Sequence, residues 1–121
     1  MSAPAVAWSV RLSTAAETDF RKIVRWSARE FGGLQARTYA RTLSLAIEAL
    51  ANGPEIVGVR RREDIGRGLM SLHVARGRRK GRLFVIFRAG REGEQRFIEV
   101  LRLLHDAMDT ARHIPADAPD G

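Results

Sequence analysis

Three residues near the C-terminal end have side chains that could bind a metal ion, namely His105, Asp109 and His113. Their spacing would place all three on one face of a continuous helix. The two histidines would then be separated by about 12 Å along the helix axis, which is too far for both to bind one ion. We therefore predict no metal site, and expect His105 to form hydrogen bonds at the end of a strand.

A second set of residues could cleave RNA. Attack by a 2′-hydroxyl on phosphorus requires a general base, a general acid and cations that stabilise the pentavalent phosphate. The side chains of suitable type are His73 and His105 for proton transfer, and Arg76, Arg78, Arg88 and Arg102 as cations. A ribonuclease therefore stays open as one interpretation of the residues alone.

Other chemistries are excluded more directly. The chain has no cysteine, which rules out disulfides and thiolate catalysis. The sequence contains no G-x-S-x-G motif for a nucleophilic serine, and the stretch IGRGL lacks the spacing of a phosphate-binding loop.

Positive charge is concentrated in one part of the chain. The formal net charge is +7, and residues 60–82 contain nine basic and two acidic side chains, nine minus two being +7. The basic residues are Arg60, Arg61, Arg62, Arg67, Arg76, Arg78, Arg79, Lys80 and Arg82. Such a block predicts an anionic partner, either a phosphate backbone or an acidic protein segment, although a solvated hairpin that aids solubility has the same composition.

The spacing of apolar and polar residues predicts the strands and helices that would position these side chains. Residues 8–13 alternate between apolar and polar side chains, which is typical of a half-buried strand. Thr14 and Glu17 match a capping box, so we expect an amphipathic helix over 14–31. Trp26 lies outside the apolar stripe of that helix and is expected to pack on the next one.

A second amphipathic helix is expected over 34–52, with Tyr39 on its apolar stripe. Because only a short glycine link separates it from the first helix, the two should form an antiparallel hairpin. Residues 55–68 have no clear period and predict a basic loop.

Three strands and a short helix complete the prediction. The strand over 69–75 alternates, whereas those over 82–88 and 97–104 are nearly all apolar and should be buried on most of both faces. The turns between them are rich in glycine and suit hairpins. A short helix is expected over 106–112, ending before Pro115.

The order of elements predicts an α+β fold. We expect a mostly antiparallel four-stranded sheet, with the N-terminal αα-hairpin packed on one face and a short C-terminal helix. At 121 residues the chain should form a single domain, with flexible tails over 1–7 and 115–121. No apolar stretch approaches the roughly 20 residues that span a bilayer, and the start does not resemble a secretory signal, so a cytoplasmic protein is expected.

The C-terminal stretch VLRLLHDAMDTARHIP also resembles a known family. An apolar strand carrying an arginine is followed by a histidine, a Met-Asp pair and an Arg-His pair. The residues are Arg102, His105, Met108, Asp109, Arg112 and His113. This pattern is similar to the C-terminal signature of the ParE branch of the RelE/ParE toxins, and the resemblance extends over about residues 8–115. Toxins of this family share the predicted order of elements.

The resemblance implies a function by binding. A ParE-type toxin would bind and poison DNA gyrase, would be neutralised by a ParD-like antitoxin in a hetero-oligomer, and would need no cofactor. RelE relatives instead cleave messenger RNA on the ribosome, often with a tyrosine close to the C-terminus. Here the only tyrosine is Tyr39, and Ile114 follows His113, so a RelE-like nuclease is the alternative.

A third interpretation is a small basic nucleic-acid-binding module. Its stacking surface would need exposed aromatic residues, whereas Phe84, Phe87 and Phe97 lie in strands expected to be buried. Direct specific binding of nucleic acid is therefore not expected. The candidate contacts for the antitoxin or the target are Arg60, Arg61, Arg62, Arg76, Arg78, Arg79, Lys80, His105, Asp106, Met108, Asp109, Arg112 and His113.

Overall fold

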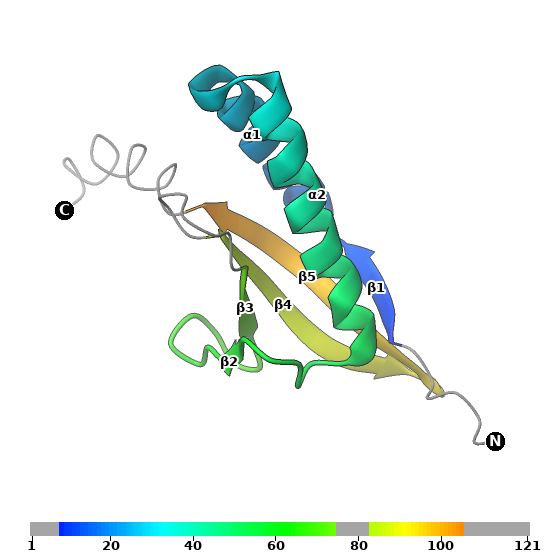
Figure 1. The fold of residues 1–121 in the computed structure, drawn as a ribbon. Coiled ribbons are helices and arrows are strands. Elements are labelled where there is room, and N and C mark those ends of the chain that lie inside the picture. Colours follow the sequence, from blue (N-terminus) through cyan, green and yellow to red (C-terminus); the bar gives the residue numbers. More distant parts are fainter. Residues whose placement is uncertain (1–7, 75–82, 106–121) are drawn as a thin grey trace.

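A computed structural model of the chain describes residues 8–74 and 83–105. The elements in order are β1 (Ser9–Leu12), α1 (Thr14–Phe31), α2 (Gly33–Ala49), the 3-10 turn η1 (Leu50–Asn52), β2 (Val59–Arg61), β3 (Met70–Val74), β4 (Leu83–Glu92) and β5 (Gln95–His105). In Figure 1 the two helices form a hairpin that crosses one face of a twisted sheet. The α+β class and the helical hairpin on one face are confirmed.

The sheet itself differs from the prediction. It has five strands in the order β1-β5-β4-β3-β2, and β1 pairs in parallel with β5 while the other three pairings are antiparallel. The four-stranded prediction was wrong because β2 forms within the stretch expected to be a basic loop. This strand has only three residues, two of them arginines, so hydrophobic periodicity gives no signal for it.

The start of α1 also differs in detail. Ser13, not Thr14, is the N-cap residue, and its Oγ accepts a hydrogen bond from the Ala16 N–H at 3.0 Å. The same hydroxyl donates to the Leu101 carbonyl oxygen of β5 at 2.9 Å. The capping site is therefore fixed by a contact with the sheet as well as by the local sequence.

The core lies between the helical hairpin and the sheet. It combines the inward faces of both helices with those of β3, β4 and β5, and its largest members include Tyr39, Leu43, Leu83, Phe87 and Ile98. Val85 and Val100 are both 0% exposed, which confirms that the helices cover this face.

The opposite face of the sheet, called here the outer face, has no helix from the described residues packed on it. Phe97 is nevertheless only 6% exposed, because its ring lies beside Gly90 and the Arg11 guanidinium stacks on it at 4.0 Å from the ring centroid. Arg88 is exposed on the same face. The expectation that β4 and β5 are buried on both faces is therefore only partly correct.

Trp26 contacts aromatic rings of its own helix and of the last strand. Its ring contacts Phe31 at 5.7 Å and the imidazole of His105 at 4.6 Å, measured between centroids. His105 ends β5, is 1% exposed and also contacts Tyr39 at 5.8 Å. Trp26 thus joins α1 to the end of the sheet, a contact that depends on the pairing of distant segments.

Several expectations concern residues outside the described part. These are the basic turn within 75–82, the short helix over 106–112 and the two tails. Among the helices that the structure describes, none combines the length and the apolar character needed to cross a membrane.

Candidate functional site

A basic pocket lies on the outer face, where β2, β3 and β4 adjoin. Alternate residues of a strand face the same side, so Ser71 and His73 point away from the helices while Leu72 between them enters the core. Arg60 pairs with Ser71, and His73 pairs with Phe84. These residues line a pocket of about 460 Å³, together with Gly58, Arg61 and Arg62. We call it the outer-face pocket.

The three arginines of this pocket are not equivalent. Arg62 donates from Nε to Asp64 Oδ1 at 3.0 Å and from Nη2 to Oδ2 at 2.9 Å. The hydrogen bond with Arg62 lowers the pKa of Asp64 and raises that of Arg62, so both groups stay ionised and their charges cancel. Arg60 and Arg61 are exposed and form no ion pair or hydrogen bond with any described residue.

No acidic side chain in the described part of the chain lines the outer-face pocket. Among the described residues that line it, Arg60 and Arg61 are the cations without a carboxylate partner. Sequence reasoning identified these arginines but treated residues 60–82 as one block. Only the structure distinguishes the neutralised Arg62 from its two neighbours.

Aromatic rings form the other side of the pocket. The His73 and Phe84 rings lie 5.2 Å apart between centroids at an interplanar angle of 36°. His73 is exposed and Phe84 is half buried, whereas Phe87 and Phe97 are buried as expected. The expectation that all three phenylalanines are buried is thus only partly correct, because Phe84 is half buried on the outer face.

The residues proposed for a nuclease are not brought together. His73 is exposed on the outer face, whereas His105 is buried on the helix side against Trp26 and Tyr39. Arg88 is paired with Glu99, with an Nη2 to Oε1 distance of 2.8 Å. One general acid and one general base from this set therefore cannot reach the same phosphate.

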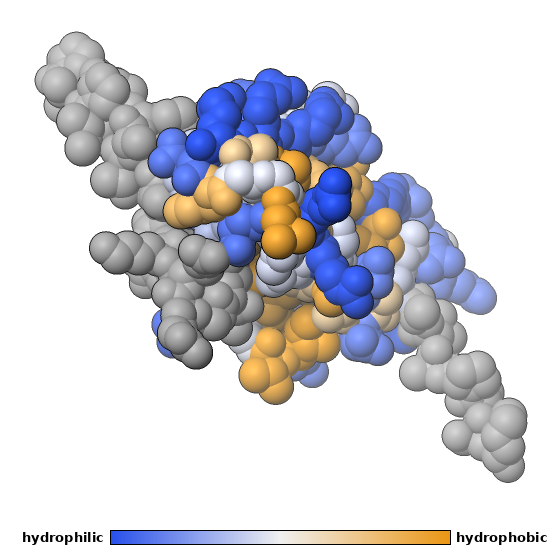
Figure 2. All heavy atoms as spheres, turned by 45° about the horizontal axis from the view of Figure 1, so that its top comes forward, coloured by the Kyte–Doolittle hydropathy of each residue, from blue (hydrophilic) through white to orange (hydrophobic). Residues whose placement is uncertain are grey.

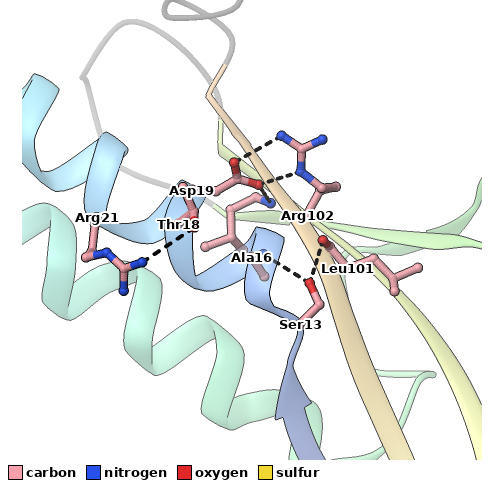
Figure 3. Close-up of polar contacts among 8 residues, drawn as sticks. Ser13, Ala16, Thr18, Asp19, Arg21, Leu101 and Arg102 are labelled. Carbon is pink, nitrogen blue, oxygen red and sulfur yellow. Dashed lines mark hydrogen bonds and ion pairs between the residues drawn. The ribbon is translucent and has the colours of Figure 1, made fainter.

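Arg102 has a structural partner. Its Nε and Nη2 donate to the two carboxylate oxygens of Asp19 at 2.7 and 3.0 Å, and Asp19 also accepts from the Leu103 N–H at 2.9 Å (Figure 3). Asp19 is 7% exposed and belongs to α1. This contact ties the first helix to the last strand.

A second candidate surface is apolar and lies on the helix side. Here α2, the segment after η1 and the edge of β3 enclose a groove of about 340 Å³. The lining residues are Thr42, Leu45, Ala46, Ala49, Ile56, Val57, Leu72, His73 and Val74. Leu45 is 53% exposed and Val57 is 98% exposed, and Figure 2 shows hydrophobic surface between charged regions on this side. We call it the α2–β3 groove.

The two surfaces meet at one sheet edge. His73 lines both, and its N–H donates to the Gly58 carbonyl at 3.3 Å, so the segment before β2 continues along the edge of β3 there. Sequence analysis named neither Leu45 nor Val57 as a candidate contact. The signal for them was weak, because Leu45 lies outside the apolar stripe of α2 and Val57 lies in a segment without a period.

The remaining candidate contacts lie outside the described residues. They are Arg76, Arg78, Arg79, Lys80, Asp106, Met108, Asp109, Arg112 and His113. Within 8–74 and 83–105, no group of three histidine, aspartate or glutamate side chains could hold a metal ion.

Comparisons with known proteins point to one family. The sequence model of the family described as "ParE toxin of type II toxin-antitoxin system, parDE" matches residues 10–110. A chain of the solved structure "Chromosomal ParDE TA system from P. aeruginosa" is similar in fold, with a TM-score of 0.52 and 17% sequence identity. The similarity covers 84% of this chain and 99% of that chain. No curated protein matches by sequence.

Proposed function

This chain belongs to the ParE toxin family of type II toxin–antitoxin systems, and we propose that it arrests growth by binding DNA gyrase and disabling it. Membership of the family supports the choice of gyrase as the target. The proposal needs only a binding surface, since the toxin would act by holding its target in an unproductive state.

The arrangement of ionisable residues agrees with action by binding. A nuclease with the chemistry considered above would need an acid and a base near one phosphate, and the two described histidines that could serve lie on opposite faces of the sheet. Arg88 and Arg102 are held by Glu99 and Asp19 respectively. We therefore propose that the chain has no intrinsic ribonuclease activity.

A ParD-like antitoxin is the proposed partner, and the α2–β3 groove is its proposed docking surface. This groove is the observation that carries the proposal, because it exposes Leu45 and Val57 beside α2 and β3. An amphipathic segment that folds on binding would bury these side chains. The exposed Arg60 and Arg61 of the adjoining β2 would attract its acidic residues.

The proposal is tested by adding the purified chain to purified gyrase and relaxed plasmid DNA. We expect loss of supercoiling, and recovery when the antitoxin encoded beside the toxin gene is added first. A parallel reaction contains ribosomes and messenger RNA instead of gyrase. Normal supercoiling together with cleaved messenger would reject the gyrase proposal and favour the RelE-like alternative.

A further inference from the structure

We infer that the side of the helical hairpin that faces solvent binds the phosphate backbone of duplex DNA without reading its sequence. Six exposed basic side chains form this surface, which we call the basic helical face. They are Arg21, Lys22, Arg25 and Arg29 of α1, and Arg37 and Arg41 of α2. The surface shares no residue with the outer-face pocket or with the α2–β3 groove. It therefore goes beyond the proposed binding of an antitoxin.

Helical geometry aligns the arginines of α1. Arg25 lies two residues from Ile23 and two from Ser27, which are 2% and 0% exposed. Two residues correspond to a rotation of about 200° around the helix axis, so Arg25 points to solvent. Arg21 and Arg29 lie four residues before and after Arg25, at steps of about 6 Å along the axis. The three guanidinium groups therefore form one row along the helix.

The second helix adds a parallel row. Arg41 lies two residues from Tyr39 and two from Leu43, which are 1% and 0% exposed, so it too points to solvent. Because the helices form an antiparallel hairpin, the end of α1 that carries Arg29 lies beside the start of α2 that carries Arg37. The two rows thus form a single basic surface.

The structure pairs its carboxylates elsewhere. Asp19, which is buried in α1, holds Arg102 of β5. The other paired acids belong to the sheet and its loops, and they are Asp64, Glu92 and Glu99. Within the described part of the chain, none of the six basic side chains forms an ion pair. A count along the sequence hides this surface, because it sets acids that are already paired against arginines that are not.

Three exposed acids remain on the two helices, against six basic residues. Glu17 and Glu48 lie at the start of α1 and near the end of α2, which is the end of the hairpin away from its connection. The third, Glu30, follows Arg29 directly. Positive charge is therefore in excess over the middle of the hairpin and toward its connection, where it would attract a polyanion.

The composition of this surface favours duplex DNA over an acidic protein. Protein interfaces are centred on buried aromatic or apolar anchors, and the six residues include none. The large hydrophobic residues exposed on the helices are Phe31 and Leu34 at the connection and Leu45 in the α2–β3 groove. Binding to a phosphate backbone needs only cations, since it is driven by the release of counterions. A single strand would need aromatic rings on which its bases stack.

The spacing also suits a duplex. The row on α1 spans about 12 Å, a length over which duplex DNA carries about seven phosphate charges. Each arginine of the row can therefore meet a phosphate. The choice of DNA over duplex RNA rests on the proposed function, because DNA gyrase acts on DNA.

The first experiment measures binding of the full chain to a short fluorescein-labelled DNA duplex of arbitrary sequence by anisotropy over a range of salt concentrations. The test variant carries Arg21→Gln, Arg25→Gln and Arg29→Gln, since glutamine keeps the helix propensity of arginine. The matched control carries Arg60→Gln, Arg61→Gln and Arg67→Gln, which remove the same charge from exposed positions of the 60–82 block.

We expect the test variant to bind at least about tenfold more weakly at about 0.1 M salt, and the slope of log affinity against log salt to become shallower by about 2.7. The control should change less than about threefold. Losses in the control as large as those in the test variant would overturn the inference, since binding would then follow net charge or the 60–82 block.

A second experiment locates the DNA without changing any charge. The chain has no cysteine, so a single introduced cysteine can carry a photoactivated cross-linker. Ala28→Cys places it on exposed α1 between Arg25 and Arg29, and Ile65→Cys places it in the loop after β2, where Ile65 is 46% exposed. We expect at least about fivefold more cross-linked duplex from Ala28→Cys, because phosphate contacts fix the orientation of the bound protein. An equal or reversed yield would contradict binding at the hairpin.

Competition identifies the class of ligand. Unlabelled duplex DNA should displace the probe more effectively than polyglutamate at equal charge, and equal displacement would overturn the inference in favour of an acidic protein. Duplex RNA that competes better than DNA would overturn the choice of DNA. All binding is measured without gyrase or antitoxin. Loss of supercoiling inhibition with DNA binding intact would therefore reject only the proposed function, whereas absence of DNA binding with inhibition intact would reject only this inference.

Discussion

Asp19 and Arg102 are 83 residues apart in the sequence and form a two-pronged ion pair, with Nε to Oδ2 at 2.7 Å and Nη2 to Oδ1 at 3.0 Å. The pair lies where β1 has ended and the edge of β5 continues. Ser13 and Asp19 take over the hydrogen bonds of that edge, since Ser13 N–H donates to the Val100 carbonyl and Leu103 N–H donates to Asp19. The first turns of α1 therefore replace the missing strand.

Removal of the Asp19 carboxylate should destabilise the fold. We expect Asp19→Ala to cost about 1–3 kcal/mol in the free energy of unfolding, because the Leu103 N–H loses its acceptor in a buried place. Arg102→Ala should cost less, because the arginine side chain is 50% exposed and Asp19 keeps its backbone donor. Urea unfolding measures both, with Glu92→Gln in an exposed ion pair as the control. A larger cost for Arg102→Ala than for Asp19→Ala would contradict this account.

Gly90 should not tolerate a side chain. A Cβ at this position would lie 2.4 Å from Phe97 Cζ, so Gly90→Ala must displace the ring that Arg11 covers. We expect a loss of about 1–3 kcal/mol in thermal unfolding, and a smaller loss when Phe97→Leu is also present to make room. Gly33→Ala is the control, since an added Cβ would meet no atom within 4 Å beyond its chain neighbours and the adjacent backbone of its own helix, and helical alanine is favoured over glycine. Equal costs with and without Phe97→Leu would count against a steric cause.

Growth arrest should survive the loss of either histidine. His73→Ala removes an exposed ring, and His105→Leu keeps an apolar side chain of similar size beside Trp26 and Tyr39. We expect both variants to arrest growth on expression, with no cleaved messenger RNA in either case. Nuclease action would be established if a variant with an unchanged unfolding temperature no longer arrested growth and the parent chain cleaved messenger RNA.

The α2–β3 groove should hold the antitoxin mainly through its exposed apolar residues. Combining Leu45→Ser with Val57→Ser should weaken the complex about tenfold, chiefly through faster dissociation. The unfolding temperature should hardly change, because both side chains already face solvent. Leu34→Ser is the matched control, since Leu34 is 79% exposed at the start of α2 and does not line the groove. Similar losses for the control and the double variant would remove the groove from the interface.

Electrostatic attraction of the antitoxin by these arginines can be tested by measuring rates of association. Changing Arg60, Arg61 and Arg62 together to alanine should slow association and flatten its dependence on salt. Most of the effect should already be present in the Arg60 and Arg61 double variant, because Asp64 neutralises Arg62. Stopped-flow measurements at low and high salt decide this, and an unchanged salt dependence in the triple variant would exclude these arginines from steering.

The local sequence pattern was sufficient to predict the helices and strands that bury an apolar stripe. The helix predicted over 14–31 has those bounds, and the helix predicted over 34–52 corresponds to α2 with η1. The three long strands were also predicted, because a run of apolar residues between glycine-rich turns has few other stable conformations. The resemblance of the C-terminal stretch further indicated the family that the comparison then matched.

Tertiary structure decided which face each strand presents and what lies beside it. β2 exists because β3 offers an edge to Val59, Arg60 and Arg61, and Phe84 lies on the outer face because Leu83 and Val85 on either side of it enter the core. Asp64 neutralises Arg62 but neither of its neighbours, and Asp19 reaches the edge of β5 because β1 stops at Leu12. Periodicity reports only the spacing of apolar residues along the chain, whereas these contacts depend on strand order, and strand order is set by packing between segments far apart in sequence.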